Sequence, residues 1–179
     1  MTKMQNTIKL TDRDFYEREV LEVAPDLLGK FLCRKLDTGD ILKYRITETE
    51  AYDGNGDLAC HASKGRTGRT EVMFHEGGLI YVYLIYGMYW MLNVVTGKVN
   101  QPQAVLIRGL EQCYGPGRLT RLLKIDKSFY GEDLCLSERL WIESDRKSHE
   151  ILVGKRIGVD YAGEWKNKDW RFFIKGFGK

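Results

Sequence analysis

Alternating apolar and polar positions predict two β-hairpins in the first half of the chain. The first joins 31–36 to 41–52 through a short polar turn that contains a glycine, which is the usual signal for a hairpin. The second divides an uncharged run into 79–85 and 88–95, with Tyr86 at its tip. A membrane span would also lack charge, but this run is at the short end of spanning length and its aromatic residues are spread through its middle. We therefore expect a hairpin there and no membrane span.

Helices are expected to be few and short. One has Thr11 as its N-cap and runs to residue 19, a second has Pro25 in its first turn and ends at Gly29, and a third follows a Gly-Pro-Gly turn. The 179 residues contain no repeats or linker-like segments, so we expect one compact α+β domain, residues 1–179, around a mostly antiparallel sheet. Its first ten residues are expected to be flexible. The third helix is predicted over 118–124, and further short strands are predicted over 104–110, 140–144 and 150–160.

The strand predicted over 41–52 changes chemistry halfway along one face. Alternate side chains of a strand share a face, so Leu42 and Ile46 lie on the same side as Glu48 and Glu50. Acids on a core-facing strand are unfavourable unless they are paired, hydrogen-bonded or needed for chemistry. The pattern indicates either a catalytic strand end or two glutamates that lie beyond the sheet in solvent.

Two further residues could carry chemistry near these acids. Arg108 lies inside the apolar run AVLIRGL, where a guanidinium should find an anion such as Glu50, in either a catalytic or a structural ion pair. His61 follows the acidic strand closely, although a lone histidine is more often structural than functional. The chain has neither CxxC nor a second histidine at metal-ligand spacing, so no metal site is expected.

Tyrosines 81, 83, 86 and 89 alternate through the second hairpin. Such a pattern usually indicates packing in a core. Tyr86 at the turn cannot readily be buried by its own hairpin, so it is available to a partner, and stacked nucleic-acid bases are one such partner.

The charge balance is mildly basic. There are 28 Lys and Arg against 25 Asp and Glu, with a formal charge of +3, which is compatible with a polyanionic partner without establishing one. The basic side chains could bind phosphates or could form a solvated surface. Together with the acids and aromatic residues, they suit an enzyme that acts on a nucleic-acid base. The two basic clusters are Lys64, Arg66 and Arg69, and Arg118, Arg121, Lys124 and Lys127.

Cysteine spacing and the N-terminus indicate the compartment. The four cysteines are widely spaced and suggest neither a zinc site nor a disulfide framework. The first ten residues contain no apolar core of a secretory signal. We therefore expect a cytoplasmic protein with reduced thiols.

Five segments in order resemble one family. They are ITETEAYDGNGDLACHASKGRTGRTEVMF, IYVYLIYGMYWMLNVV, AVLIRGLE, GPGRLT and RIGVDYAGEW. They resemble the alkyladenine (3-methyladenine) DNA glycosylases, the methylpurine glycosylase family with a bacterial branch, from about Phe15 to Phe173. The resemblance implies a curved antiparallel sheet and a metal-free, cofactor-free enzyme. Such an enzyme flips a damaged purine out of duplex DNA and hydrolyses its N-glycosidic bond.

The resemblance also implies roles for individual residues. Glu50 would be the general base that activates water, and Arg108 together with the backbone carbonyl of Ile157 would help to hold that water. Glu48 receives no role from the family, although its like charge could raise the pKa of Glu50. The residues expected to form the base pocket and the duplex contact are Tyr52 and His61 on either side of the flipped base, Tyr83 at its edge, Asn93 against the 2-amino group of guanine, and Tyr86 in the gap left in the duplex.

Three positions depart from the family pattern. Gly68 and Asp169 stand where prolines are common, and Cys60 replaces a small polar residue before the histidine. These departures concern the loop after His61 rather than the chemistry. A glycosylase that also cleaves the strand through a lysine, and a non-catalytic nucleic-acid-binding module, remain as alternatives. Lesion preference is left open, and a monomer is expected.

Overall fold

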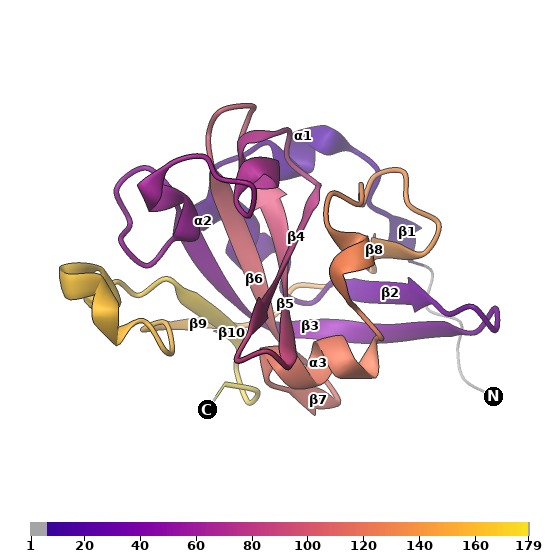
Figure 1. Cartoon of the computed structure of the whole chain (residues 1–179). Helices are drawn as coiled ribbons and strands as arrows, with labels where there is room; N and C mark the ends of the chain where they lie inside the picture. The colour runs from indigo at the N-terminus through magenta and orange to yellow at the C-terminus, as the bar shows by residue number, and fades with distance from the viewer. Residues whose placement is uncertain (1–6, 179) are drawn as a thin grey trace.

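The computed structural model describes residues 7–178 and contains a large antiparallel sheet (Figure 1). Its strands in chain order are β1 (Ile8–Lys9), β2 (Phe31–Lys35), β3 (Ile41–Asp53), β4 (Ile80–Ile85), β5 (Tyr89–Thr96), β6 (Gln103–Leu110), β7 (Cys113–Tyr114), β8 (Leu140–Ser144), β9 (Ile151–Gly154) and β10 (Arg171–Ile174). The main order across the sheet is β1-β8-β2-β3-β6-β5-β4, with β10 between β3 and β9. Both predicted hairpins are present.

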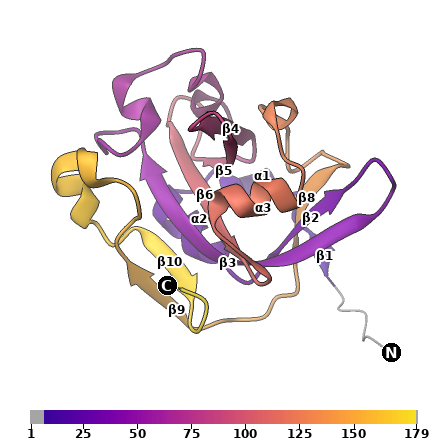
Figure 2. The same cartoon turned by 60° about the horizontal axis from the view of Figure 1, so that its bottom comes forward.

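Strand β3 connects the two halves of the sheet. Its first residues, 41–45, pair with β2, whereas residues 46–53 pair with β6, and β10 joins at 48–50. The strand bends as it passes from one set of neighbours to the other (Figure 2). The expected α+β fold with a mostly antiparallel sheet is therefore confirmed, and the end of β3 that carries the two glutamates lies between β6 and β10.

Short helices cover parts of this sheet. Helix α2 packs against β3 and β6, and α3 packs against β5 and β6. A main apolar core joins these helices to the strands, and a smaller apolar cluster surrounds Tyr81 beside the candidate site. The helical segments are α1 (Arg13–Tyr16), α2 (Val20–Asp26) and α3 (Pro116–Leu122), together with the 3-10 helices η1 (His61–Lys64), η2 (Glu71–Phe74), η3 (Lys127–Phe129) and η4 (Asp160–Asn167).

The helix boundaries differ from the sequence prediction. Asp12, not Thr11, caps α1, because its carboxylate accepts the N–H of Asp14 at 3.1 Å, and the helix ends at residue 16. Pro25 lies in the last turn of α2 rather than its first. The helix starts earlier, at Val20, whose N–H donates to the side-chain amide oxygen of Gln103, on a distant strand, at 2.9 Å. No local pattern in the sequence could have indicated that partner.

The turn between β4 and β5 holds Tyr86 in an unfavourable backbone conformation. Tyr86 and Gly87 both have positive φ, at 51° and 67°, and the N–H of Met88 donates to the carbonyl of Ile85 at 3.1 Å. Positive φ at both central residues is the geometry of a type I′ turn, which glycine adopts freely and tyrosine does not. Tyr86 is 86% exposed. The fold therefore presents a strained aromatic residue at the hairpin tip.

The structure also bears on the expectations for the N-terminal residues, membrane spans, cysteines and metal sites. Residues 1–6 of the segment expected to be flexible lie outside the described residues, while residues 8–9 pair with β8. No helix within residues 7–178 has the length and apolar character to cross a bilayer. All four cysteines are free, and the described part of the chain contains no cluster of three or more potential metal ligands.

Candidate active site

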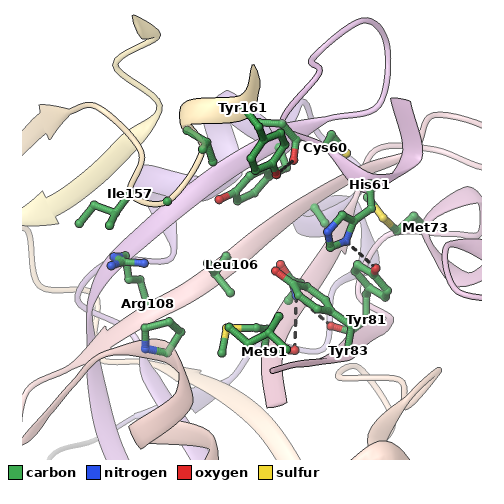
Figure 3. A pocket seen from close by; sticks show the side chains of 18 of the residues that line it. Cys60, His61, Met73, Tyr81, Tyr83, Met91, Leu106, Arg108, Ile157 and Tyr161 are labelled. Carbon is green, nitrogen blue, oxygen red and sulfur yellow. Dashed lines mark hydrogen bonds between the residues drawn. The ribbon is translucent and has the colours of Figure 1, made fainter. Parts of the chain in front are cut away.

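A cavity of about 350 Å³ opens beside the end of β3 (Figure 3). Arg108 and Ile157 lie at one end of the cavity, whereas His61, Tyr81 and Tyr83 lie at the other. The structure thus gathers residues that are more than 100 positions apart in the chain. Those predicted site residues that line the cavity are Tyr52, His61, Tyr83, Tyr86, Asn93, Arg108 and Ile157.

Glu50 lies directly behind this lining and is fully buried. The backbone N–H of Ile157 donates to its Oε1 at 2.8 Å, and the Tyr52 hydroxyl donates to its Oε2 at 2.8 Å. Arg108 Nε is 3.6 Å from the same Oε1. Burial raises the pKa of Glu50, while Arg108 and the two hydrogen bonds oppose that rise. The carboxyl group is therefore removed from water, and Arg108, Ile157 and Tyr52 favour its charged form without fully offsetting the burial.

Glu48 is also fully buried, so the interpretation of two solvent-exposed glutamates is wrong. Its Oε1 lies 3.2 Å from Arg108 Nε and 2.9 Å from Arg171 Nη1. Strand β10, which carries Arg171, pairs with β3 at residues 48–50. Two carboxylates and two guanidinium groups thus form one charge network.

An irregular register places Arg108 in this network. Ile46 pairs with Leu110 and Glu48 pairs with Gly109, but Thr49 pairs with Ile107. Arg108 is therefore an extra residue in β6 at a β-bulge, a feature that redirects a side chain. A side chain on Gly109 would place its Cβ 3.1 Å from the Cβ of Glu48. Glycine at 109 allows the two strands to approach where the acids lie.

Histidine and tyrosine form the opposite wall. Helix η1 begins at His61, whose Nδ1 lies 2.9 Å from the Tyr81 hydroxyl. The His61 and Tyr83 rings meet edge to face, with centroids 4.6 Å apart. Burial, together with the nearby charge of Arg69, lowers the pKa of His61 to about 4. The imidazole is therefore neutral at physiological pH.

Asn93 lies on β5 with 3% of its surface exposed. Its Nδ2 donates to the carbonyl of Tyr81 across the hairpin at 3.1 Å. This bond fixes the amide at the cavity wall and limits its rotation away from a bound group.

The predicted basic residues lie outside the cavity lining. Lys64 and Arg66 are exposed near η1, and Arg66 pairs with Glu71 at 3.1 Å. The guanidinium of Arg69 lies over the outer side of the aromatic wall, 4.9 Å from the Tyr83 ring centroid. Two residues of the second group, Arg118 and Arg121, are exposed on α3, where Arg121 lies 5.7 Å from the Tyr89 ring centroid. Lys127 of the second group and Arg69 of the first line a second pocket beside Tyr83.

Comparison with known proteins identifies the family. The family model described as Methylpurine-DNA glycosylase (MPG) matches residues 14–114 and 111–177. The chain belongs to the methylpurine-DNA glycosylase family. A relative from Methanocella arvoryzae is 47% identical over 91% of each chain. Another, from Legionella pneumophila, is 46% identical over 91% of this chain and 93% of its own. Both carry the name "Putative 3-methyladenine DNA glycosylase". Membership places the chain among the hydrolases of base excision repair.

Sequence reasoning missed several residues around this cavity. Arg156 and Asp57 form a buried ion pair next to Tyr52, and Arg171 completes the network around Glu48. Tyr161 lines the cavity and donates its hydroxyl to the carbonyl of Ala59 at 3.2 Å. The one available signal was an arginine directly before Ile157 in RIGVD. Nothing in the sequence connects that arginine to Asp57, which is 99 positions away.

Proposed function

We propose that this glycosylase hydrolyses the N-glycosidic bond of alkylated or deaminated purines in duplex DNA and leaves an abasic site. One observation carries the proposal: a buried carboxyl group, Glu50, lies behind one end of an aromatic cavity and is surrounded by Ile157, Tyr52 and Arg108. A carboxylate paired with an arginine in a cleft is suited to proton abstraction from water. Binding alone would not require it.

The aromatic cavity would hold the damaged base outside the duplex. Chemistry on a base inside a helix requires that the base be extruded into a pocket. Tyr52 and the neutral imidazole of His61 would stack on the base, with Tyr83 at its edge. Alkylated purines are electron-poor or cationic, so aromatic faces attract them. A neutral His61 adds no charge repulsion to that attraction.

The proposed chemistry uses the opposite end of the cavity. Glu50, Arg108 and the carbonyl of Ile157 hold a water, and Glu50 accepts a proton as the water oxygen bonds to the sugar C1′. The bond between C1′ and the purine nitrogen breaks, and its electron pair leaves with the purine. The Glu50 carboxylate also stabilises the positive charge that develops on the sugar, as in glycoside hydrolysis.

A base-release assay on defined duplexes tests this function. Each duplex would carry 3-methyladenine, 7-methylguanine, hypoxanthine or ethenoadenine, and we expect free base from at least one and an intact abasic strand. If none of the four duplexes released a free base, the protein would instead be a non-catalytic nucleic-acid-binding module. A covalent DNA adduct after borohydride trapping would identify a lysine Schiff base and hence a bifunctional enzyme; we expect none.

A further inference from the structure

An ion pair between Asp57 and Arg156 lies beside the cavity and takes no part in the chemistry proposed above. Both side chains are fully buried. Arg156 Nη1 lies 2.5 Å from Asp57 Oδ2, and Nη2 lies 2.9 Å from Oδ1, so the contact is bidentate. Only arginine presents the planar pair of donors that this geometry uses.

The pair connects four separate segments of the chain. Arg156 donates to the carbonyl of Ala51 at 2.9 Å and to the carbonyl of Trp165 at 3.1 Å. Asp57 accepts the N–H of Ala59 at 3.0 Å. Ala51 separates Glu50 from Tyr52 on β3, and Ala59 lines the cavity. A displacement of the pair would therefore move both β3 and the loop that leads to His61.

Arg156 also contacts the rear of the site directly. Its guanidinium carbon lies 4.8 Å from the centroid of the Tyr52 ring, the ring that lines the cavity and whose hydroxyl donates to Glu50. The next residue, Ile157, supplies the N–H that binds the other oxygen of Glu50. Both hydrogen bonds to Glu50 thus come from groups that Arg156 supports, one through a ring and one through the chain.

Stability alone is a weak reason for such a pair. A buried ion pair is often no more stabilising than apolar side chains of the same volume, because both charges lose their hydration. It does fix geometry, since every donor has a set direction. We propose that Asp57 and Arg156 are positioning residues that set Tyr52 and Ile157 against Glu50. This inference rests on the proposed function and names neither residue as catalytic.

The proposal predicts a specific change in pH dependence. Loss of the two hydrogen bonds from Ile157 and Tyr52 removes two contacts that lower the pKa of Glu50, so that pKa rises. Because the base must be charged, the acid limb of the rate profile moves to higher pH. The charged and titratable groups that face Glu50 are Glu48 and Tyr52 on β3, Arg108 on β6, Arg171 on β10, Tyr83 on β4 and Arg156 after β9.

The test compares Asp57→Asn with Asp145→Asn. Asp145 forms a pair with Arg45 whose side chains are only 5% and 11% exposed, and neither residue lines the cavity. Both variants lose one carboxylate from a buried pair. Single-turnover base release is measured from pH 5 to 9 with saturating enzyme, together with the urea midpoint of each variant. We expect Asp57→Asn to lose about 10²-fold in rate with its acid limb at higher pH, while Asp145→Asn keeps the wild-type rate and limb.

Two results would overturn the proposal. One is an unshifted acid limb in Asp57→Asn, or a rate loss that its unfolded fraction fully explains. The other is failure of both Asp57→Asn and the conservative Arg156→Lys to fold, which would make the pair purely structural. A wild-type protein that releases no base would refute the proposed function instead, so the two failures are distinguishable.

Discussion

Arg108 Nε lies closer to Glu48 than to Glu50, at 3.2 Å against 3.6 Å. Glu48 is held by Arg171 as well, at 2.9 Å. The acid without a family role is thus the more strongly paired of the two. Its negative charge raises the pKa of Glu50, and its contact draws Arg108 partly away from Glu50.

Glu48→Gln should therefore move the acid limb of base release to lower pH. The substitution removes a like charge and leaves Arg108 free to approach Glu50, and both effects lower the pKa of Glu50. The pH dependence of single-turnover rates in the variant and the wild type measures the shift. A limb that stays in place or moves to higher pH would show that Glu48 does not tune the base.

Tyr86→Ala should weaken capture of a lesion in duplex DNA by about 1–3 kcal/mol, the range for one aromatic stacking contact. The tyrosine is 86% exposed at a strained turn, so its loss should not disturb the core. Met88→Ala, an exposed residue of the same turn, is the matched control. If Tyr86→Ala and the control bound lesion duplexes with equal affinity, Tyr86 would have no part in capturing the lesion.

Asn93→Ser should increase the release of guanine relative to hypoxanthine. These bases differ by the 2-amino group, and the Asn93 amide is fixed by the carbonyl of Tyr81, so a shorter side chain gives that group room. The measurement is the ratio of the two rates, with exposed Asn100→Ser as control. An unchanged ratio in Asn93→Ser would contradict steric selection at this wall.

His61 should make the fold sensitive to acid. Its pKa is about 4 in the folded protein against about 6.5 in an unfolded chain. Between these values the unfolded chain binds a proton that the folded chain does not, so stability falls as pH decreases from about 6.5 to about 4. Urea unfolding at pH 7.5 and 4.5 should show a smaller loss for His61→Gln than for the wild type. An equal loss would mean that His61 is not buried in its neutral form.

Local sequence patterns were sufficient to predict the hairpins. They were not sufficient to predict the network of charged side chains around Glu48 and Glu50. The tip at Tyr86 follows from Gly87 and the alternation on either side. By contrast, the first N–H of α2, that of Val20, has its acceptor on Gln103, and the buried Glu48 has a partner on Arg171. Such partners lie too far along the chain for any periodicity to indicate them. The bulge at Arg108 is equally invisible, because it arises from the register between β3 and β6.

The candidate site was expected from the family resemblance more than from the strand pattern. Alternation alone left Glu48 and Glu50 equivalent. The structure separates them, since only Glu50 receives hydrogen bonds from Tyr52 and Ile157. Neither the strand pattern nor the family resemblance indicated the ion pair between Asp57 and Arg156.

Glu50→Gln tests the central claim most directly. The amide keeps the shape of the side chain but removes the charge that would activate water, so the variant should still bind lesion DNA. Loss of a general base costs about 10²- to 10⁴-fold, and loss of charge stabilisation adds to that. Glu150→Gln, in an exposed pair with Lys175, is the control and should match the wild type. We predict that single-turnover release of hypoxanthine or ethenoadenine falls at least about 10²-fold in Glu50→Gln; release within about tenfold of the wild-type rate would show that Glu50 is not the general base.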